Sequence, residues 1–191
     1  MIRIGILGDI GSGKTYVASN LGFPVFNADK EVEKIYKKDK KIFTKLKKKL
    51  PRYFSKFPIE KNEVLKAILD NESNLKKITK IIHEEVRNKM NNFLKKNSNK
   101  KFVVLDIPLL LENKINHKND ILIFVQSKKK DILKKLKKRK NFNYNLFKKF
   151  KSLQLPLDFK KKNSNFIIKN NFSRKFVNIE INNILKKLKN E

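Results

Sequence analysis

The chain has 191 residues, which is enough to bury a hydrophobic core, and its lack of cysteine excludes disulfides and thiol chemistry. Lysine and arginine number 48 against 18 acidic residues, so the formal net charge is +30. No apolar run approaches the roughly 18 residues that a transmembrane helix needs, and the chain begins on strand-like residues without a signal peptide. We therefore expect a cytoplasmic protein that does not engage a membrane.

A charge of this size is the usual sign of a nucleic-acid or acidic-membrane partner. Here, however, 43 of the basic residues are lysine and only five are arginine. Recognition of phosphate and bases favours the planar fork of arginine, whereas lysine, asparagine, isoleucine and phenylalanine share A/T-rich codons. We favour genomic base bias and expect no specific nucleic-acid partner. A selected polyanion-binding surface is the alternative.

The first elements predict a strand, a glycine turn and a helix. Residues 2–7 form a short, mainly apolar run that ends at Gly8, which is typical of a buried strand that leads into a turn. A helical pattern starts at Lys14, and Gly22 is a plausible stop. A second short strand is predicted at residues 23–26, before another helix.

The middle of the chain, from about residue 37 to 99, is lysine-rich, lacks glycine and has helical periodicity, so it predicts a helical insertion. Continuously apolar runs follow at residues 102–105 and 121–125, which suits parallel strands covered on both faces. A basic helical stretch spans residues 128–162. A last short strand at 166–168 precedes a closing amphipathic helix.

Strands that alternate with helices predict an α/β fold, here a doubly wound parallel sheet of five strands of the phosphate-loop NTPase type. In such sheets a ligand binds at the carboxyl ends of the strands.

Residues 8–15 satisfy the pattern G-x4-G-K-[ST] of a phosphate-binding loop, of which roughly 0.002 chance matches are expected in a chain of this composition. Small residues let consecutive backbone N–H groups surround a polyphosphate at a helix N-terminus. Lys14 can then reach the β- and γ-phosphates, and the hydroxyl of Thr15 can bind Mg²⁺. A tight glycine turn without a ligand is the alternative.

Two carboxylates follow predicted strands. Asp29 comes after the second strand, where it could accept the proton of an attacking hydroxyl or instead cap the next helix. Asp106 follows the third strand, the usual place of a second support for Mg²⁺, although Pro108 makes a plain turn residue the alternative.

Three strings, residues 6–15, 24–29 and 105–112, together resemble the dephospho-coenzyme A kinase family. The third, D-x-P-L-L-x-E, is more specific than the phosphate loop. Further similar segments follow in the family's order at residues 82–87, 154–160 and 166–170. The resemblance implies a kinase that transfers the γ-phosphoryl group of ATP, with Mg²⁺, to the 3′-hydroxyl of dephospho-coenzyme A, the last step of coenzyme A synthesis.

The resemblance also implies a single kinase domain over residues 1–191, and we expect a monomer. Its nucleotide-binding core would comprise residues 1–36, 100–126 and 163–191. The helical region from about 37 to 99 would bind the substrate, and a lid would span about 127–162.

Site residues follow from the resemblance position by position. Asp29 would be the catalytic base, assisted by Lys14 and by Arg139 of the lid. Nucleotide would be bound by Gly11, Ser12, Gly13, Lys14, Thr15, Tyr16 and Asn170, the last near the adenine, and Mg²⁺ by Thr15 and Asp106. The coenzyme A side would be bound by His83, Arg87, Asp106, Leu110 and Glu112.

The chain departs from the family pattern at several positions, namely Asp9 for glycine, Asn27 for aspartate, Glu60-Lys61 for Asp-Arg, and Glu84 for proline. Without the resemblance, His83 is as easily a packed helical residue, Arg139 a solvated surface residue, and His117 has no assigned role. Two other functions stay open, namely a nucleoside or nucleotide kinase and a polyanion-binding protein with a vestigial loop.

Overall fold

The computed structural model describes residues 1–138 and 142–189, which form two compact units. One unit combines Met1–Asn27 with Asn97–Glu191, and the other is Ala28–Lys96. The helical unit begins at Ala28, nine residues before the sequence-based boundary of 37, because the helix that starts there packs against the later helices of the same unit.

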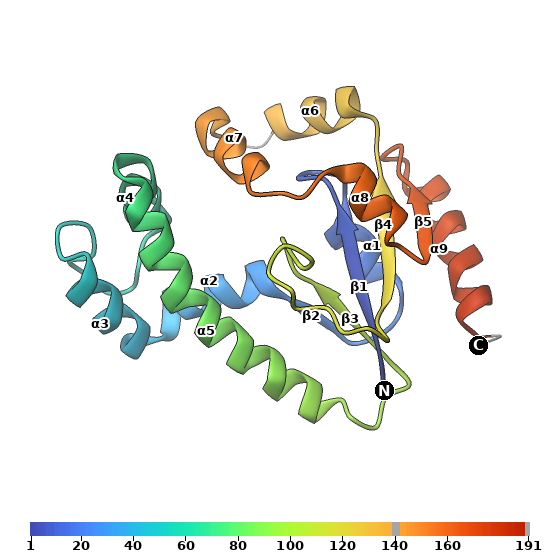
Figure 1. The fold of residues 1–191 in the computed structure, drawn as a ribbon, viewed down its shortest axis with the longest axis horizontal. Coiled ribbons are helices and arrows are strands. Elements are labelled where there is room, and N and C mark those ends of the chain that lie inside the picture. The colour runs from blue at the N-terminus through green and yellow to red at the C-terminus, as the bar shows by residue number, and fades with distance from the viewer. Residues whose placement is uncertain (139–141, 190–191) are drawn as a thin grey trace. The chain divides into compact units, whose positions relative to one another are not determined.

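The first unit contains a parallel five-stranded sheet, as predicted (Figure 1). Its order is β2-β3-β1-β4-β5, and every neighbouring pair is parallel. The central strand β1 pairs with β3 on one side and β4 on the other, so its carboxyl end lies in the middle of the sheet. The strands are β1 (Ile2–Gly8), β2 (Val25–Asn27), β3 (Phe102–Asp106), β4 (Ile121–Gln126) and β5 (Phe166–Lys169).

One face of the sheet is covered by α1 (Lys14–Asn20) and α9 (Arg174–Lys189). Because strand side chains alternate between faces, Ile4 and Ile6 of β1 point to this side together. The apolar residues of α9 recur at intervals of three or four, which places them on one stripe of the helix. These side chains form a continuous core with Val17, Ala18, Leu21, Val177, Ile181, Ile184 and Leu188.

The opposite face of β1 is covered by the loop after β3 and by α8 (Leu157–Lys162). Leu110 of that loop is 1% exposed and lies against Gly5, where a Cβ atom would come within 2.7 Å of Leu110 Cδ2. The glycine therefore lets the loop approach the sheet closely.

Two further helices of the first unit, α6 (Lys129–Lys137) and α7 (Tyr144–Ser152), lie at the end of the sheet toward which the strands run (Figure 1). Ile132 and Leu136 of α6 are buried and lie close to Gly11. None of the helices in the described part of the chain is long and apolar enough to cross a membrane.

The second unit consists of four helices, in which the long α5 packs against the other three. Its apolar residues Leu75, Ile78, Ile82 and Val86 follow helical spacing and are buried. Side-chain caps define two of the helix starts, where Asp39 accepts from Ile42 N and Glu60 forms a capping box with Glu63. The helices are α2 (Ala28–Lys38), α3 (Lys40–Lys49), α4 (Lys61–Asp70) and α5 (Glu72–Lys96).

Candidate phosphate-transfer site

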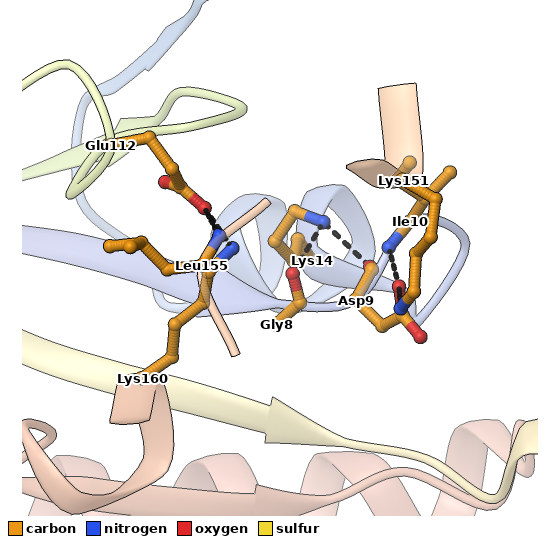
Figure 2. A network of polar contacts seen from close by, with 8 residues as sticks. All are labelled: Gly8, Asp9, Ile10, Lys14, Glu112, Lys151, Leu155 and Lys160. Carbon is orange, nitrogen blue, oxygen red and sulfur yellow. Dashed lines mark hydrogen bonds and ion pairs between the residues drawn. The ribbon is translucent and has the colours of Figure 1, made fainter. Parts of the chain in front are cut away.

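The glycine-rich loop joins the carboxyl end of β1 to the N-terminus of α1, as the sequence predicts. Its turn is closed by a hydrogen bond of 3.1 Å from Ser12 N to the carbonyl oxygen of Asp9. Lys14 Nζ donates to the same oxygen at 2.8 Å and to Gly8 O at 3.3 Å (Figure 2). The buried hydroxyl of Ser12 has no hydrogen-bond partner among the described residues. The loop thus holds one ammonium group and offers a buried hydroxyl at a helix N-terminus, a suitable site for an anion.

Asn170, which directly follows β5, fixes this loop from the side. Its Nδ2 donates to Ser12 O at 2.7 Å, its Oδ1 accepts from Phe172 N at 2.7 Å, and its backbone N donates to Gln126 O. Gly13 lies against the same amide with φ 92°, and a Cβ there would lie 2.2 Å from Asn170 Nδ2. Asn170 is 5% exposed and its side chain lies against the phosphate loop, while its expected place near the adenine stays a prediction.

A pocket of about 290 Å³ opens beside the loop. It combines an aromatic ring with cationic groups, since Lys135 Nζ lies 5.7 Å from the centre of the Phe172 ring and Arg174 also lines the pocket. Tyr16, another lining residue, donates its hydroxyl hydrogen bond to Asn178 at 3.1 Å. A planar base and phosphate groups suit such a lining. The lining residues are Gly11, Gly13, Tyr16, Lys135, Asn170, Phe172, Ser173, Arg174 and Val177.

Sequence reasoning missed five of these residues, namely Lys135, Phe172, Ser173, Arg174 and Val177. Phe172 and Arg174 follow Asn170 closely, and their position after the last strand was the signal that could have found them. Lys135 carries no such signal, because it is one of 43 lysines and reaches the pocket only through the folding of α6.

Asp106 lies at the carboxyl end of β3 and is 3% exposed. Its Oδ2 accepts a hydrogen bond of 2.5 Å from Asn27 Nδ2, and the two residues are register partners on neighbouring strands. Asn27, one of the departures from the family pattern, therefore supplies a neutral donor to this carboxylate. An aspartate at position 27 would instead place a second carboxylate next to that of Asp106, and the two charges would repel each other.

Thr15 and Asp106 offer oxygen donors of the kind that Mg²⁺ prefers. Thr15 is exposed at the start of α1, and Asp106 ends the neighbouring strand β3. The described residues contain no group of three or more His, Cys, Asp or Glu side chains that could enclose a metal. The donor set fits Mg²⁺, which keeps several waters and binds through few protein ligands and substrate phosphates.

Glu112 is engaged within the protein. Its Oε1 forms an ion pair of 2.5 Å with Lys160 Nζ and accepts from Leu155 N at 3.0 Å, while its buried Oε2 has no partner among the described residues (Figure 2). Both charged side chains are more than nine-tenths buried. Leu110 is buried too, with its side chain against Gly5 of β1, and its expected role in substrate binding stays a prediction.

The remaining predicted residues belong to the second unit or lie outside the described residues. Asp29 lies in the first turn of α2. His83 and Arg87 lie one turn apart on α5, and burial, with a smaller effect of the Arg87 charge, lowers the pKa of His83. Arg139 lies outside the described residues.

A parallel sheet whose first strand leads through a glycine-rich loop into a helix, with a lysine in the loop and a base-sized pocket beside it, defines a phosphate-loop kinase fold. The family model described as dephospho-CoA kinase matches residues 2–175. The chain belongs to the dephospho-CoA kinase family and is an ATP-dependent phosphotransferase.

Relatives and solved structures agree with this placement. Dephospho-CoA kinase from Wolbachia sp. subsp. Brugia malayi is 32% identical over 97% of both chains, and that of Rickettsia typhi is 30% identical over 98% of both. A Thermus thermophilus protein shares the fold with a TM-score of 0.76 at 23% identity, covering 99% of this chain and 96% of that one. Dephospho-CoA kinase from Campylobacter jejuni has a TM-score of 0.66 at 21% identity, with coverage of 97% and 96%.

Proposed function

We propose that this chain transfers the γ-phosphoryl group of ATP to the 3′-hydroxyl of dephospho-CoA, giving CoA and ADP. One observation carries the proposal: a fully formed phosphate loop, with Lys14 held at it and a pocket of about 290 Å³ beside it, in a chain that matches the family over residues 2–175. Phosphoryl transfer depends mainly on positioning and charge neutralisation, which such a loop supplies.

On the nucleotide side, the loop from Gly11 to Tyr16 holds the phosphates. The pocket holds the adenine, with Phe172 as the aromatic wall and Asn170 as the support of the loop. Thr15 and Asp106 hold Mg²⁺, which would neutralise charge on the transferring group when bound. Lys14 leaves the loop carbonyls to contact the β- and γ-phosphates.

On the acceptor side, Asp29 takes the proton of the 3′-hydroxyl. His83, Arg87 and the loop from Asp106 to Glu112 bind dephospho-CoA, and Arg139 closes on the phosphoryl group with the lid of residues 127–162. Asp29 also lies in the first turn of α2, where a carboxylate stabilises the helix. Its catalytic and structural roles must therefore be separated by experiment.

The test follows ADP release and product mass for the purified chain with MgATP and either dephospho-CoA or a panel of nucleosides. Turnover with dephospho-CoA supports the proposal, and turnover with nucleosides alone would contradict it. Asp29→Asn should reduce turnover about 100-fold or more, the lower range for a general base, while ATP affinity changes less than about twofold. Glu31→Gln, an acid in the same helical turn, is the matched control and should stay near wild type. Loss of folding or of ATP binding in Asp29→Asn would instead assign a structural role.

The proposal includes a cytoplasmic monomer that binds no specific nucleic acid. Size-exclusion chromatography with light scattering tests the monomer. Nucleic-acid affinity measured against salt concentration tests the second point, because a polyanion-binding protein gives a steep dependence on salt.

A further inference from the structure

Asp9 places a carboxylate inside the phosphate loop, at a position where the resemblance expects glycine. Its Oδ1 accepts a hydrogen bond of 2.7 Å from Ile10 N and forms an ion pair of 2.5 Å with Lys151 Nζ (Figure 2). The Asp9 side chain is 13% exposed and that of Lys151 is 37% exposed. A residue far along the chain thus meets the loop through a charged, mostly enclosed contact.

A carboxylate at this place opposes the loop's task, because it repels the polyphosphate that the backbone N–H groups attract. Within the loop, Lys14 Nζ donates to the carbonyl oxygens of Gly8 and Asp9. Lys151 Nζ is the cation bonded directly to the Asp9 carboxylate. Helix α7 therefore supplies a cation to the carboxylate of the phosphate loop.

The same contact fixes where α7 lies. Lys151 is in the last turn of α7, so its bond to Asp9 ties the end of this helix to the loop between β1 and α1. None of the residues of α7 is fully buried, so the helix has little apolar packing to hold it. A charged contact at its end matters more for such a helix than for one anchored in the core.

We propose that Lys151 is a positioning residue for nucleoside triphosphate binding, which makes the Asp9 loop compatible with a polyanion and holds α7 beside it. The ligand class rests on the proposed function, whereas the attachment of α7 does not. Lys151 acts through Asp9, and this distinguishes it from a lysine that contacts phosphate directly.

A double-mutant cycle on ATP affinity tests the coupling, with calorimetry of MgATP binding as the readout. Lys151→Gln should raise Kd for MgATP about tenfold, since it leaves the carboxylate unbalanced. Asp9→Asn retains an acceptor for Ile10 N and should bind MgATP at least as well as wild type. In the Asp9→Asn background, Lys151→Gln should change Kd less than about twofold. An equal loss in both backgrounds, or no loss in either, would overturn the proposal.

A readout without nucleotide separates this proposal from the proposed function. Amide hydrogen exchange over residues 144–152 of the free protein should become faster in Lys151→Gln and in Asp9→Asn, with no further increase in the double variant. Lys148→Gln removes another charge of the same helix, at an exposed lysine that lies over the Tyr144 ring, and as the control it should leave Kd unchanged. Unchanged exchange in both single variants would overturn the attachment of α7, whether or not the chain phosphorylates dephospho-CoA. Failure of wild type to bind MgATP would overturn the triphosphate role alone.

Discussion

Asn170 Nδ2 donates a hydrogen bond of 2.7 Å to Ser12 O, so the end of the last strand holds the loop that follows the first strand. Ser12 O accepts a second hydrogen bond, of 3.0 Å, from the hydroxyl of Ser127 after β4. Residues that follow β4 and β5 therefore both donate to one carbonyl group in the loop that follows β1. The loop is held in shape before any ligand arrives, and such preorganisation reduces the entropy cost of binding.

Replacing Asn170 by alanine should weaken this arrangement. The change removes the donor to Ser12 O and leaves Phe172 N without its acceptor, which should lower the free energy of unfolding by about 1–3 kcal/mol. We also expect a higher Kd for ATP, measured by calorimetry. Asn171→Ala is the control, because Asn171 makes the same kind of turn contact to Ser173 N without touching the loop. Equal ATP affinity in the two variants would contradict a role for Asn170 in holding the loop.

Gly13→Ala should disturb the same contact from the other side. The new methyl group would meet Asn170 Nδ2 at 2.2 Å with φ at 92°, so we expect a loss of ATP binding together with a loss of stability. Gly22→Ala separates strain from collision, since its φ of 77° is also left-handed but nothing lies within 4 Å of the added atom. It should cost about 1–2 kcal/mol of unfolding free energy and leave ATP affinity intact. Similar ATP affinities in the two variants would show that the collision is harmless.

The buried pair of Glu112 and Lys160 joins the loop after β3 to α8. Lys160→Met should lower the free energy of unfolding by about 3–5 kcal/mol, because it leaves a buried carboxylate without its counter-ion. Adding Glu112→Gln removes that charge while retaining an acceptor for Leu155 N, so urea denaturation should show recovery of at least part of the loss. The exposed neighbour Lys161→Met should be close to wild type. A double variant no more stable than Lys160→Met would argue against an ion-pair role.

His83 should make stability depend on pH. Burial and the Arg87 charge lower its pKa below the ordinary value of 6.5, so the unfolded chain takes up a proton at a higher pH than the folded one. Stability contributed by neutral His83 is present above about pH 6.5 and falls as the pH drops toward the folded pKa. Urea unfolding at pH 7.5 and 5.5 should show a smaller loss for His83→Gln than for wild type. Arg87→Gln should reduce the loss only in part, since burial is the larger cause. An identical loss in His83→Gln would assign the pH dependence to other groups.

The sheet and the phosphate loop could be predicted because their signals are local. Continuous apolar runs such as residues 102–105 and 121–125 admit few structures other than buried strands, and the spacing of Gly8, Gly13 and Lys14 belongs to one kind of loop. The order of the strands, β2-β3-β1-β4-β5, could not be predicted in the same way, because alternation of strands and helices does not fix which strands are neighbours.

The partners of individual lysines could not be predicted, because they depend on contacts between distant segments. Lys135, Lys151 and Lys160 look like any other lysine in the sequence, yet one lines the pocket, one pairs with Asp9 and one is buried with Glu112. Only the folded chain distinguishes them from exposed lysines such as Lys161.

Arg3, one of only five arginines in the chain, serves the fold and not the phosphate loop. Arg3 is 7% exposed and pairs with Asp120 at 2.7 Å while donating to Ile115 O at 2.8 Å. It lies near the start of β1, whereas the phosphate loop follows the end of that strand. The fixed fork of its guanidinium serves two buried acceptors at once, which explains why lysine did not replace it.

Lys14, whose ammonium group donates to the carbonyl oxygens of Gly8 and Asp9, already has oxygen partners in the free protein. When the ammonium group binds a phosphate, phosphate oxygens replace these two carbonyl oxygens as its acceptors. The carbonyl groups must then accept hydrogen bonds from water or from other donors. The contribution of Lys14 to the free energy of phosphate binding is therefore the difference between these two sets of contacts. It is smaller than the charge of the ammonium group alone suggests. The high net charge of the chain should mainly raise the association rate of a polyanion, whereas the contacts of the loop should mainly lower its dissociation rate.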